Sequence, residues 1–206
     1  MIVGVLLAAG RSSRFGTAQK LVAAFGDRTV VRSSAETLLS SPVDRVIVVL
    51  GSDADAVRSA VAGLPVTFAI NEQFADGISG SLRVGVRAAM SLGDDIAAVV
   101  LALGDQPTVS ERITREVIAR FLSGSGEKKP PLIVAARYAG ERGHPVLFAR
   151  AVFPELLTVS GDHGAREVIA RDATRVAYVD VVGSPPADVD TPADLEALAR
   201  PRRPSP

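Results

Sequence analysis

Glycines and cations follow the first apolar segment of the chain. The apolar run at 2–9 passes directly into Gly10, Arg14, Gly16 and Lys20. Glycine lets a backbone approach a ligand closely, and successive amide groups can surround an anion. Arginine and lysine neutralise phosphate charge, the first as a planar fork and the second as a point charge. This pattern predicts a polyphosphate-binding loop, although a solvated basic loop without a ligand has the same composition.

The loop does not match two common phosphate-binding motifs. It lacks the arrangement of a P-loop, and Ser12 stands where a G-x-G-x-x-G fingerprint requires glycine. A dinucleotide-binding fingerprint is therefore excluded at this position.

Aspartates follow two other strand-like segments. Asp105 comes after the apolar run at 97–103, and Asp190 lies in the segment VDTP. A carboxylate at the end of a strand suits a hard cation such as Mg²⁺, which keeps several waters and takes one or two protein carboxylates. The alternative is that Asp105 is a turn residue before Pro107 and that Asp190 only begins a capped helix.

Apolar runs alternate with amphipathic stretches along the chain. Strands are predicted at 2–9, 45–50, 66–70, 97–103, 132–136 and 175–181. Helices are predicted at 29–41, 53–63, 81–93, 110–124, 164–172 and 191–200. Thr191, Pro192 and Asp194 have the residue types of an N-cap, a first helical position and a capping acid.

This alternation predicts a single-domain, three-layer αβα, Rossmann-like fold with a mostly parallel sheet. We expect the domain to span 1–199 and the proline-rich, basic tail 200–206 to be disordered. Ligands of such folds bind beyond the carboxyl ends of the strands, so Gly10, Asn71 and Asp105 should lie at one edge of the sheet.

Composition excludes several classes of function. Twenty-three basic and 23 acidic residues cancel, which gives no indication of nucleic-acid binding. The chain has no cysteine, so disulfides, zinc thiolates and a thiol nucleophile are excluded. No Ser/His/Asp triad is evident. The first apolar run lacks a basic start and is too short to span a membrane, so we expect a cytoplasmic protein without membrane contact.

Six segments together resemble the MobA-like nucleotidyltransferases, most closely the molybdenum cofactor cytidylyltransferase branch. They are LAAGRSSRFGTAQKL (7–21), NEQFADGISGSL (71–82), GDQP (104–107), RGHPVLF (142–148), GDHGAREVI (161–169) and DVDTPADLEAL (188–198). The resemblance implies the nucleotide-diphospho-sugar transferase type of fold.

The resemblance implies roles for individual residues. Residues against the nucleotide base and ribose would be Leu7, Ala8, Ala9, Gly10, Asn71, Gly77, Ser79 and Ser81. Arg14 and Lys20 would hold phosphates and, with Asp105, carry catalysis. Asp105 and Asp190 would bind Mg²⁺. The alternative for the small hydroxyls is a helix N-cap, and Glu72 and Gly80 depart from many relatives.

The resemblance also implies a second-substrate site at His144, Arg142 and Arg166, facing a pterin that carries a phosphate. A structural histidine and a solvated salt bridge are the alternatives. Ala9 and the loop GISGSL imply CTP rather than GTP.

The activity so implied is Mg²⁺-dependent transfer of CMP from CTP to the phosphate of molybdopterin. Pyrophosphate would be released, and the molybdopterin cytosine dinucleotide formed would serve a molybdoenzyme client. The alternatives are guanylyl or cytidylyl transfer to another small phosphate or a sugar phosphate, an oxidoreductase like relatives acting on nicotine-derived pigments, and a non-catalytic cofactor-binding protein.

Overall fold

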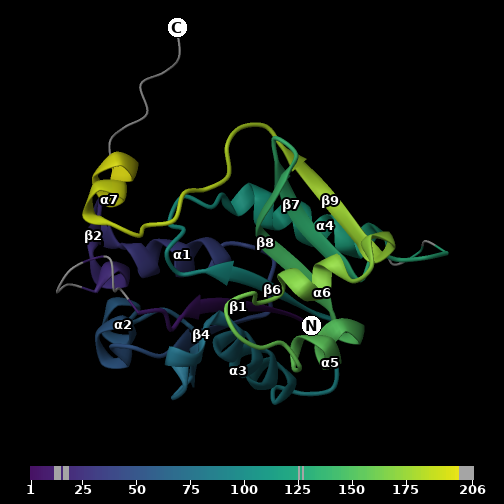
Figure 1. Cartoon of the computed structure of the whole chain (residues 1–206), viewed down its shortest axis with the longest axis horizontal. Helices are drawn as coiled ribbons and strands as arrows, with labels where there is room; N and C mark the ends of the chain where they lie inside the picture. The colour runs from purple at the N-terminus through teal and green to yellow at the C-terminus, as the bar shows by residue number, and fades with distance from the viewer. Residues whose placement is uncertain (12–14, 16–18, 125, 127, 200–206) are drawn as a thin grey trace, which may run out of the picture.

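The computed structural model describes residues 1–11, 15, 19–124, 126 and 128–199 of the 206-residue chain. Its main sheet consists of Ile2–Ala8 (β1), Arg45–Leu50 (β4), Thr67–Ile70 (β5), Ala98–Leu103 (β6), Ile133–Tyr138 (β7), Glu141–Ala149 (β8) and Val176–Val181 (β9). The seven strands lie in the order β5-β4-β1-β6-β8-β7-β9 (Figure 1). A short hairpin of Ala24–Phe25 (β2) and Arg28–Thr29 (β3) lies outside this sheet.

The sheet is mostly parallel, as the sequence predicts. β1 pairs in parallel with β4 and β6, β4 with β5, and β7 with β9. All seven residues of β1 are buried, because helices cover both faces of this central strand. The carboxyl ends of β1, β4, β5 and β6 therefore meet at one edge.

β8 departs from the parallel pattern and was not among the predicted strands. It lies between β6 and β7 and runs antiparallel to both. Its second half is buried, but its first residues are polar or small, from Glu141 to His144, and read as a loop. The pairing passes from Ala135↔Val146 to Ala136↔Gly143, so His144 lies in a bulge of this strand.

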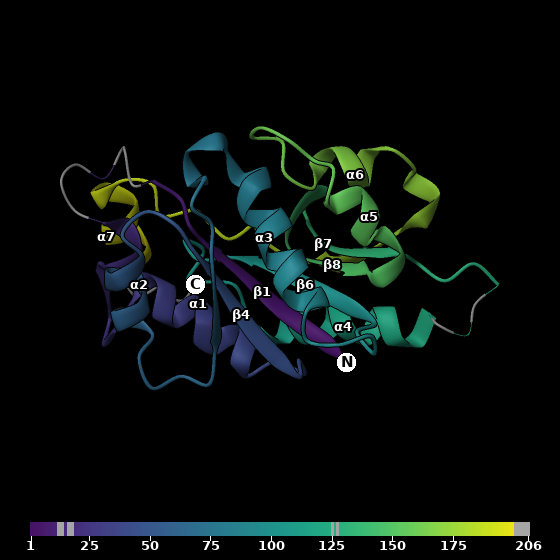
Figure 2. The ribbon, with the colours of Figure 1, turned by 90° about the horizontal axis from the view of Figure 1, so that it is seen from below.

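Helices form a layer on each face of the sheet (Figure 2). One face is covered by Val30–Leu39 (α1), Ala54–Ala60 (α2), Glu111–Gly124 (α4) and Pro192–Ala199 (α7). The other face is covered by Ile78–Met90 (α3), Phe153–Leu156 (α5) and Arg166–Ala170 (α6). The three-layer αβα fold is thereby confirmed. In the described part of the chain, no helix has both the length and the apolar character needed to cross a bilayer.

Helix ends follow the local sequence signals. Asp194 accepts hydrogen bonds from the Thr191 amide at 2.7 Å and from the Thr191 hydroxyl at 2.8 Å, and Thr191 Oγ1 accepts from the Asp194 amide at 3.2 Å. This reciprocal capping starts α7 at Pro192, as predicted. α3 begins at Ile78, three residues before the predicted start at Ser81, because Gly77 (φ 98°) turns the chain into the helix.

Candidate active site

A lysine and two aspartates meet at the carboxyl edge of the sheet. Lys20 Nζ lies 2.6 Å from Asp105 Oδ2 and 2.9 Å from Asp190 Oδ1. Asp105 follows β6, Asp190 precedes α7, and Lys20 begins the 3₁₀ turn Lys20–Val22. The two acids are 85 positions apart in the sequence and converge on one cationic point, which only the tertiary structure could bring about.

Opposing effects act on the Lys20 ammonium. Burial by itself lowers its pKa, but the nearby charges of Asp105 and Asp190 and their hydrogen bonds outweigh burial, so the pKa of Lys20 is raised. The side chain is only 10% exposed. Lys20 therefore carries a fixed positive charge at neutral pH.

The segments that carry the two acids are joined by hydrogen bonds. The Val189 amide donates to the Asp105 carbonyl oxygen at 2.9 Å, and Gln106 Nε2 donates to Asp188 Oδ1 at 2.7 Å. Val189 is fully buried. Capping of α7 is done by Thr191 and Asp194, so the Asp190 carboxylate is directed at Lys20 instead of at the helix.

A cavity of about 500 Å³ opens beside Lys20 and Asp105. Predicted nucleotide-site residues on its wall are Leu7, Ala9, Gly10, Lys20, Gly77, Ser81 and Asp105. Arg11, Phe74, Ala75, Ile78, Leu103 and Asp162 also line it, and none of these was predicted. The Arg11 guanidinium lies 5.5 Å from the centre of the Phe74 ring, so this wall combines a cation with an aromatic face.

Other predicted nucleotide contacts do not line this cavity. Ala8 is buried on the opposite face of the sheet, because neighbouring strand residues point to opposite sides. Asn71 is 3% exposed and donates from Nδ2 to Ser81 Oγ at 3.0 Å, so it orients a cavity residue. Ser79 is fully buried, and its Oγ accepts a hydrogen bond from the Gly164 amide in the loop that precedes α6. Arg14 lies outside the described residues.

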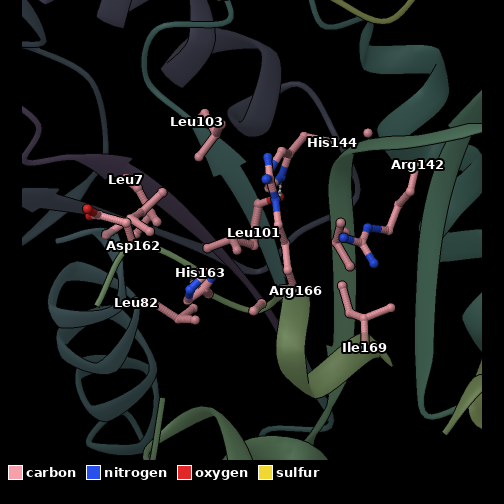
Figure 3. A pocket seen from close by; sticks show the side chains of 15 residues that line it. Leu7, Leu82, Leu101, Leu103, Arg142, His144, Asp162, His163, Arg166 and Ile169 are labelled. Carbon is pink, nitrogen blue, oxygen red and sulfur yellow. Dashed lines mark hydrogen bonds between the residues drawn. The ribbon is translucent and has the colours of Figure 1, made fainter. Parts of the chain in front are cut away.

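A second cavity of about 200 Å³ adjoins the first. Arg142, His144 and Arg166, predicted for the second substrate, all line it. Its lining includes the apolar residues Leu82, Leu101, Val146 and Ile169, of which Leu82, Leu101 and Ile169 are labelled in Figure 3. Arg142 lies on the side opposite Leu7 and Asp162 (Figure 3). Leu7, Ile78, Leu103 and Asp162 line both cavities, so the two spaces share a common wall.

His144 is neutral in this cavity. Burial is the main cause that lowers the pKa of His144 to about 4. The positive charges of Arg142 and Arg166 lower this pKa further, whereas the Leu101 carbonyl and the Asp105 charge act to raise it. Its Nδ1 lies 3.4 Å from the Leu101 carbonyl oxygen, a weak contact. The imidazole therefore offers a ligand hydrogen bonds rather than a charge.

The lowered pKa of His144 predicts acid sensitivity. Between pH 6.5 and about 4 the unfolded chain binds a proton at this residue that the native state excludes. The free energy of unfolding should therefore fall as the pH falls through this window. His144→Gln should flatten the dependence by up to about 1.4 kcal/mol per pH unit. Urea unfolding at several pH values from 4.5 to 6.5 measures this pH dependence. An equal change of the free energy of unfolding with pH in the wild-type protein and in His144→Gln would contradict the lowered pKa of His144.

Comparison with known proteins places this chain in a family. The model of the MobA-like NTP transferase domain matches residues 4–176. The chain belongs to the MobA-like NTP transferase family. The resemblance to the MobA-like nucleotidyltransferases is thus confirmed, and the protein is a nucleotidyltransferase.

Several named proteins and solved structures are similar to this chain. The chain is 32% identical to nicotine blue oxidoreductase of Paenarthrobacter nicotinovorans, over 96% of each chain. Among solved structures it is similar to Rv0371c of Mycobacterium tuberculosis, at 31% identity and a TM-score of 0.80 over 96% of each chain. A complex of Rv0371c with manganese has 32% identity and the same TM-score over 96% of this chain and 97% of that one. A nucleotidyl transferase of Methanothermobacter has 26% identity and a TM-score of 0.78, over 97% of this chain and 96% of that one.

Sequence reasoning missed several residues that line the two cavities. Arg11 follows the first strand, which was a usable signal, but it was given no role. Asp162 and His163 lie in the segment 161–169 that carries the resemblance, but neither was given a role. Phe74, Ile78 and Leu103 are ordinary apolar residues, and no spacing in the sequence marks them as cavity walls.

Proposed function

We propose that this protein transfers CMP from CTP to the phosphate of a molybdopterin-type acceptor. The observation that supports this is the pair of adjoining cavities with Lys20 and Asp105 on the wall of the larger one. The larger cavity would take the nucleotide and the smaller one the acceptor. The reacting phosphates would then meet near the shared wall.

The proposed reaction needs no covalent enzyme intermediate. An oxygen of the acceptor phosphate attacks the α-phosphorus of CTP, and the bond from that phosphorus to the bridging oxygen of pyrophosphate breaks. Pyrophosphate leaves with that electron pair. The attacking phosphate is already anionic, so a general base is not required. Lys20 contributes fixed positive charge where phosphate charge accumulates.

The carboxylates fit a divalent cation such as Mg²⁺. Asp105 Oδ2 and Asp190 Oδ1 both lie within 2.9 Å of one atom, Lys20 Nζ, so they converge on a point that favours positive charge. Within the described residues, no group of three or more His, Asp or Glu could hold a metal. Two carboxylates with water and phosphate oxygens as the remaining ligands is the usual Mg²⁺ arrangement. A bound cation would neutralise phosphate charge. The manganese complex of the similar protein Rv0371c supports dependence on a divalent cation.

The smaller cavity suits a flat acceptor with an anionic group. Its apolar lining residues and the neutral His144 can receive an uncharged ring. Arg142 and Arg166 give this cavity positive charge, which favours an anionic ligand. Ala9 and Ser81, from the segments whose resemblance implies CTP, line the larger cavity.

Pyrophosphate release tests this proposal. The purified protein with Mg²⁺ and molybdopterin would be supplied in turn with CTP, GTP, ATP and UTP. CTP should give pyrophosphate and a cytidylated pterin, and omission of the pterin should abolish release. Preference for GTP would refute the base assignment. Failure of every nucleotide with molybdopterin would refute the acceptor.

A second candidate function comes from the 32% identity to nicotine blue oxidoreductase. It predicts consumption of NADH or NADPH with a nicotine-derived pigment. The first loop lacks a G-x-G-x-x-G fingerprint, which disfavours a dinucleotide site there. Spectrophotometry at the nicotinamide band separates the two functions.

Gln106 should hold the two metal-binding segments in register. Its Nε2 donates a hydrogen bond to Asp188. Burial raises the pKa of Asp188, and this hydrogen bond only partly opposes that effect. Gln106→Leu should lower kcat about 10-fold by loosening the 188–190 segment, as seen for residues that support metal ligands. Gln106 Oε1 is buried with no hydrogen-bond partner in the described part of the chain, so the loss of stability should be small. Pyrophosphate-release kinetics measure the effect, and an unchanged kcat would contradict it.

A further inference from the structure

Ser79, at the start of α3, makes two hydrogen bonds to the loop between α5 and α6, and Arg83 of the same helix donates to the Val159 carbonyl oxygen earlier in that loop. Ser79 donates from its backbone amide to the Gly161 carbonyl oxygen at 3.2 Å. Its Oγ accepts a hydrogen bond from the Gly164 amide, also at 3.2 Å. Ser79 and Gly164 are both buried, so these bonds are shielded from water. They join segments that lie 85 positions apart.

Close packing surrounds these hydrogen bonds. A Cβ on Gly77 would lie 2.4 Å from Asp162 Oδ1 and 2.6 Å from the Gly161 carbonyl oxygen. A Cβ on Gly164 would lie 3.1 Å from a methyl carbon of Ile78. The loop 161–164 therefore rests directly on the first turn of α3 and follows its position.

The fastened loop forms a wall of the smaller cavity. Asp162, His163 and Gly164 line that cavity, and Arg166 follows at the start of α6 (Figure 3). The start of α3, on which this loop rests, contributes Gly77, Ile78 and Ser81 to the larger cavity. Ser79 itself lines neither cavity. Because the loop gives three residues to the smaller cavity and only Asp162 to the larger one, its displacement should act mainly on the smaller cavity.

We propose that Ser79 is a positioning residue that holds the loop 161–164 against α3 and thereby sets the affinity for the second substrate. This assignment replaces the expected contact of Ser79 with the nucleotide, and its substrate assignment rests on the proposed function. Loss of the hydroxyl leaves the buried Gly164 amide without its acceptor and favours a displaced loop. Affinity then falls in proportion to the fraction of molecules in which the loop is in place.

The test compares Ser79→Ala with Ser81→Ala, which removes a hydroxyl on the same turn that does line the larger cavity. Hydrogen exchange followed by mass spectrometry should show faster exchange of the 160–167 peptide in Ser79→Ala and no change there in Ser81→Ala. With saturating CTP, Ser79→Ala should raise the KM for molybdopterin about 5- to 10-fold, the effect of one lost hydrogen bond. Its kcat should stay near wild type, and its Kd for CTP, from calorimetry, should change less than about 2-fold.

Ser81→Ala should show the opposite division, with weaker CTP binding and an unchanged KM for molybdopterin. Ser79→Cys, with a similar shape and a weaker acceptor, should give values between those of wild type and Ser79→Ala. It also carries the test if Ser79→Ala fails to fold.

Two results would overturn the proposal. Unchanged exchange of the 160–167 peptide would show that Ser79 does not hold the loop. Weakening of CTP binding equal to the rise in KM would make Ser79 a nucleotide contact or a general stability residue. Exchange and CTP binding do not depend on the acceptor. A wild-type protein inactive with molybdopterin therefore refutes the proposed function separately, while the exchange result still decides whether Ser79 holds the loop.

Discussion

Asp105→Asn is expected to lower kcat for nucleotidyl transfer roughly 10²- to 10³-fold, the usual cost of losing one preorganised electrostatic group. The substitution keeps the size of the side chain but removes one of the two carboxylates that converge on Lys20. Charge stabilisation of the phosphates and the metal affinity should both fall. Pyrophosphate release and a Mn²⁺ titration measure these effects.

Asp94→Asn is the matched control for Asp105→Asn. Asp94 precedes β6, whereas Asp105 follows it, so the two aspartates lie at opposite edges of the sheet. Asp94 is fully exposed and pairs with Arg150 at 2.9 Å. Its replacement should leave kcat and Mn²⁺ affinity unchanged. Full activity of Asp105→Asn would refute the role of this carboxylate.

Lys20→Met should also reduce kcat roughly 10²- to 10³-fold, because fixed charge beside the phosphates is lost. The same substitution removes the ammonium that lies between Asp105 and Asp190. Repulsion between the two carboxylates then increases, and the free energy of unfolding should fall by about 1–3 kcal/mol. These side chains are partly exposed, at 23% and 32%, which limits the loss.

Mn²⁺ should raise the Tm of Lys20→Met more than that of the wild-type protein, because the cation no longer competes with the ammonium for these carboxylates. Thermal unfolding with and without Mn²⁺ measures the difference. Lys129→Met, in an exposed segment after α4, should behave like wild type. An equal rise in all three proteins would place the Mn²⁺ site elsewhere.

The strands of the central sheet could be predicted from the sequence, but the strand that lines the smaller cavity could not. The strands β1, β4 and β6 could be predicted because a strand covered on both faces must be apolar throughout, and the bounds 45–50 were correct to the residue. β8 could not, because its first residues line a cavity and so resemble a surface loop. Its antiparallel placement between β6 and β7 is what brings Arg142 and His144 to the wall of the smaller cavity.

By itself the sequence determined the three-layer fold, the capped start of α7 and the edge of the sheet at which Asp105 would lie, because local hydrogen bonding and the burial of strands fix these features. It also carried the family resemblance through its ordered motifs. The tertiary structure alone decided that Asp190 meets Lys20 and that Ser79 holds a loop instead of facing the larger cavity. A hydroxyl or carboxylate has the same local sequence whether it faces a cavity or a distant segment, and only the folded chain brings its partner within hydrogen-bonding distance.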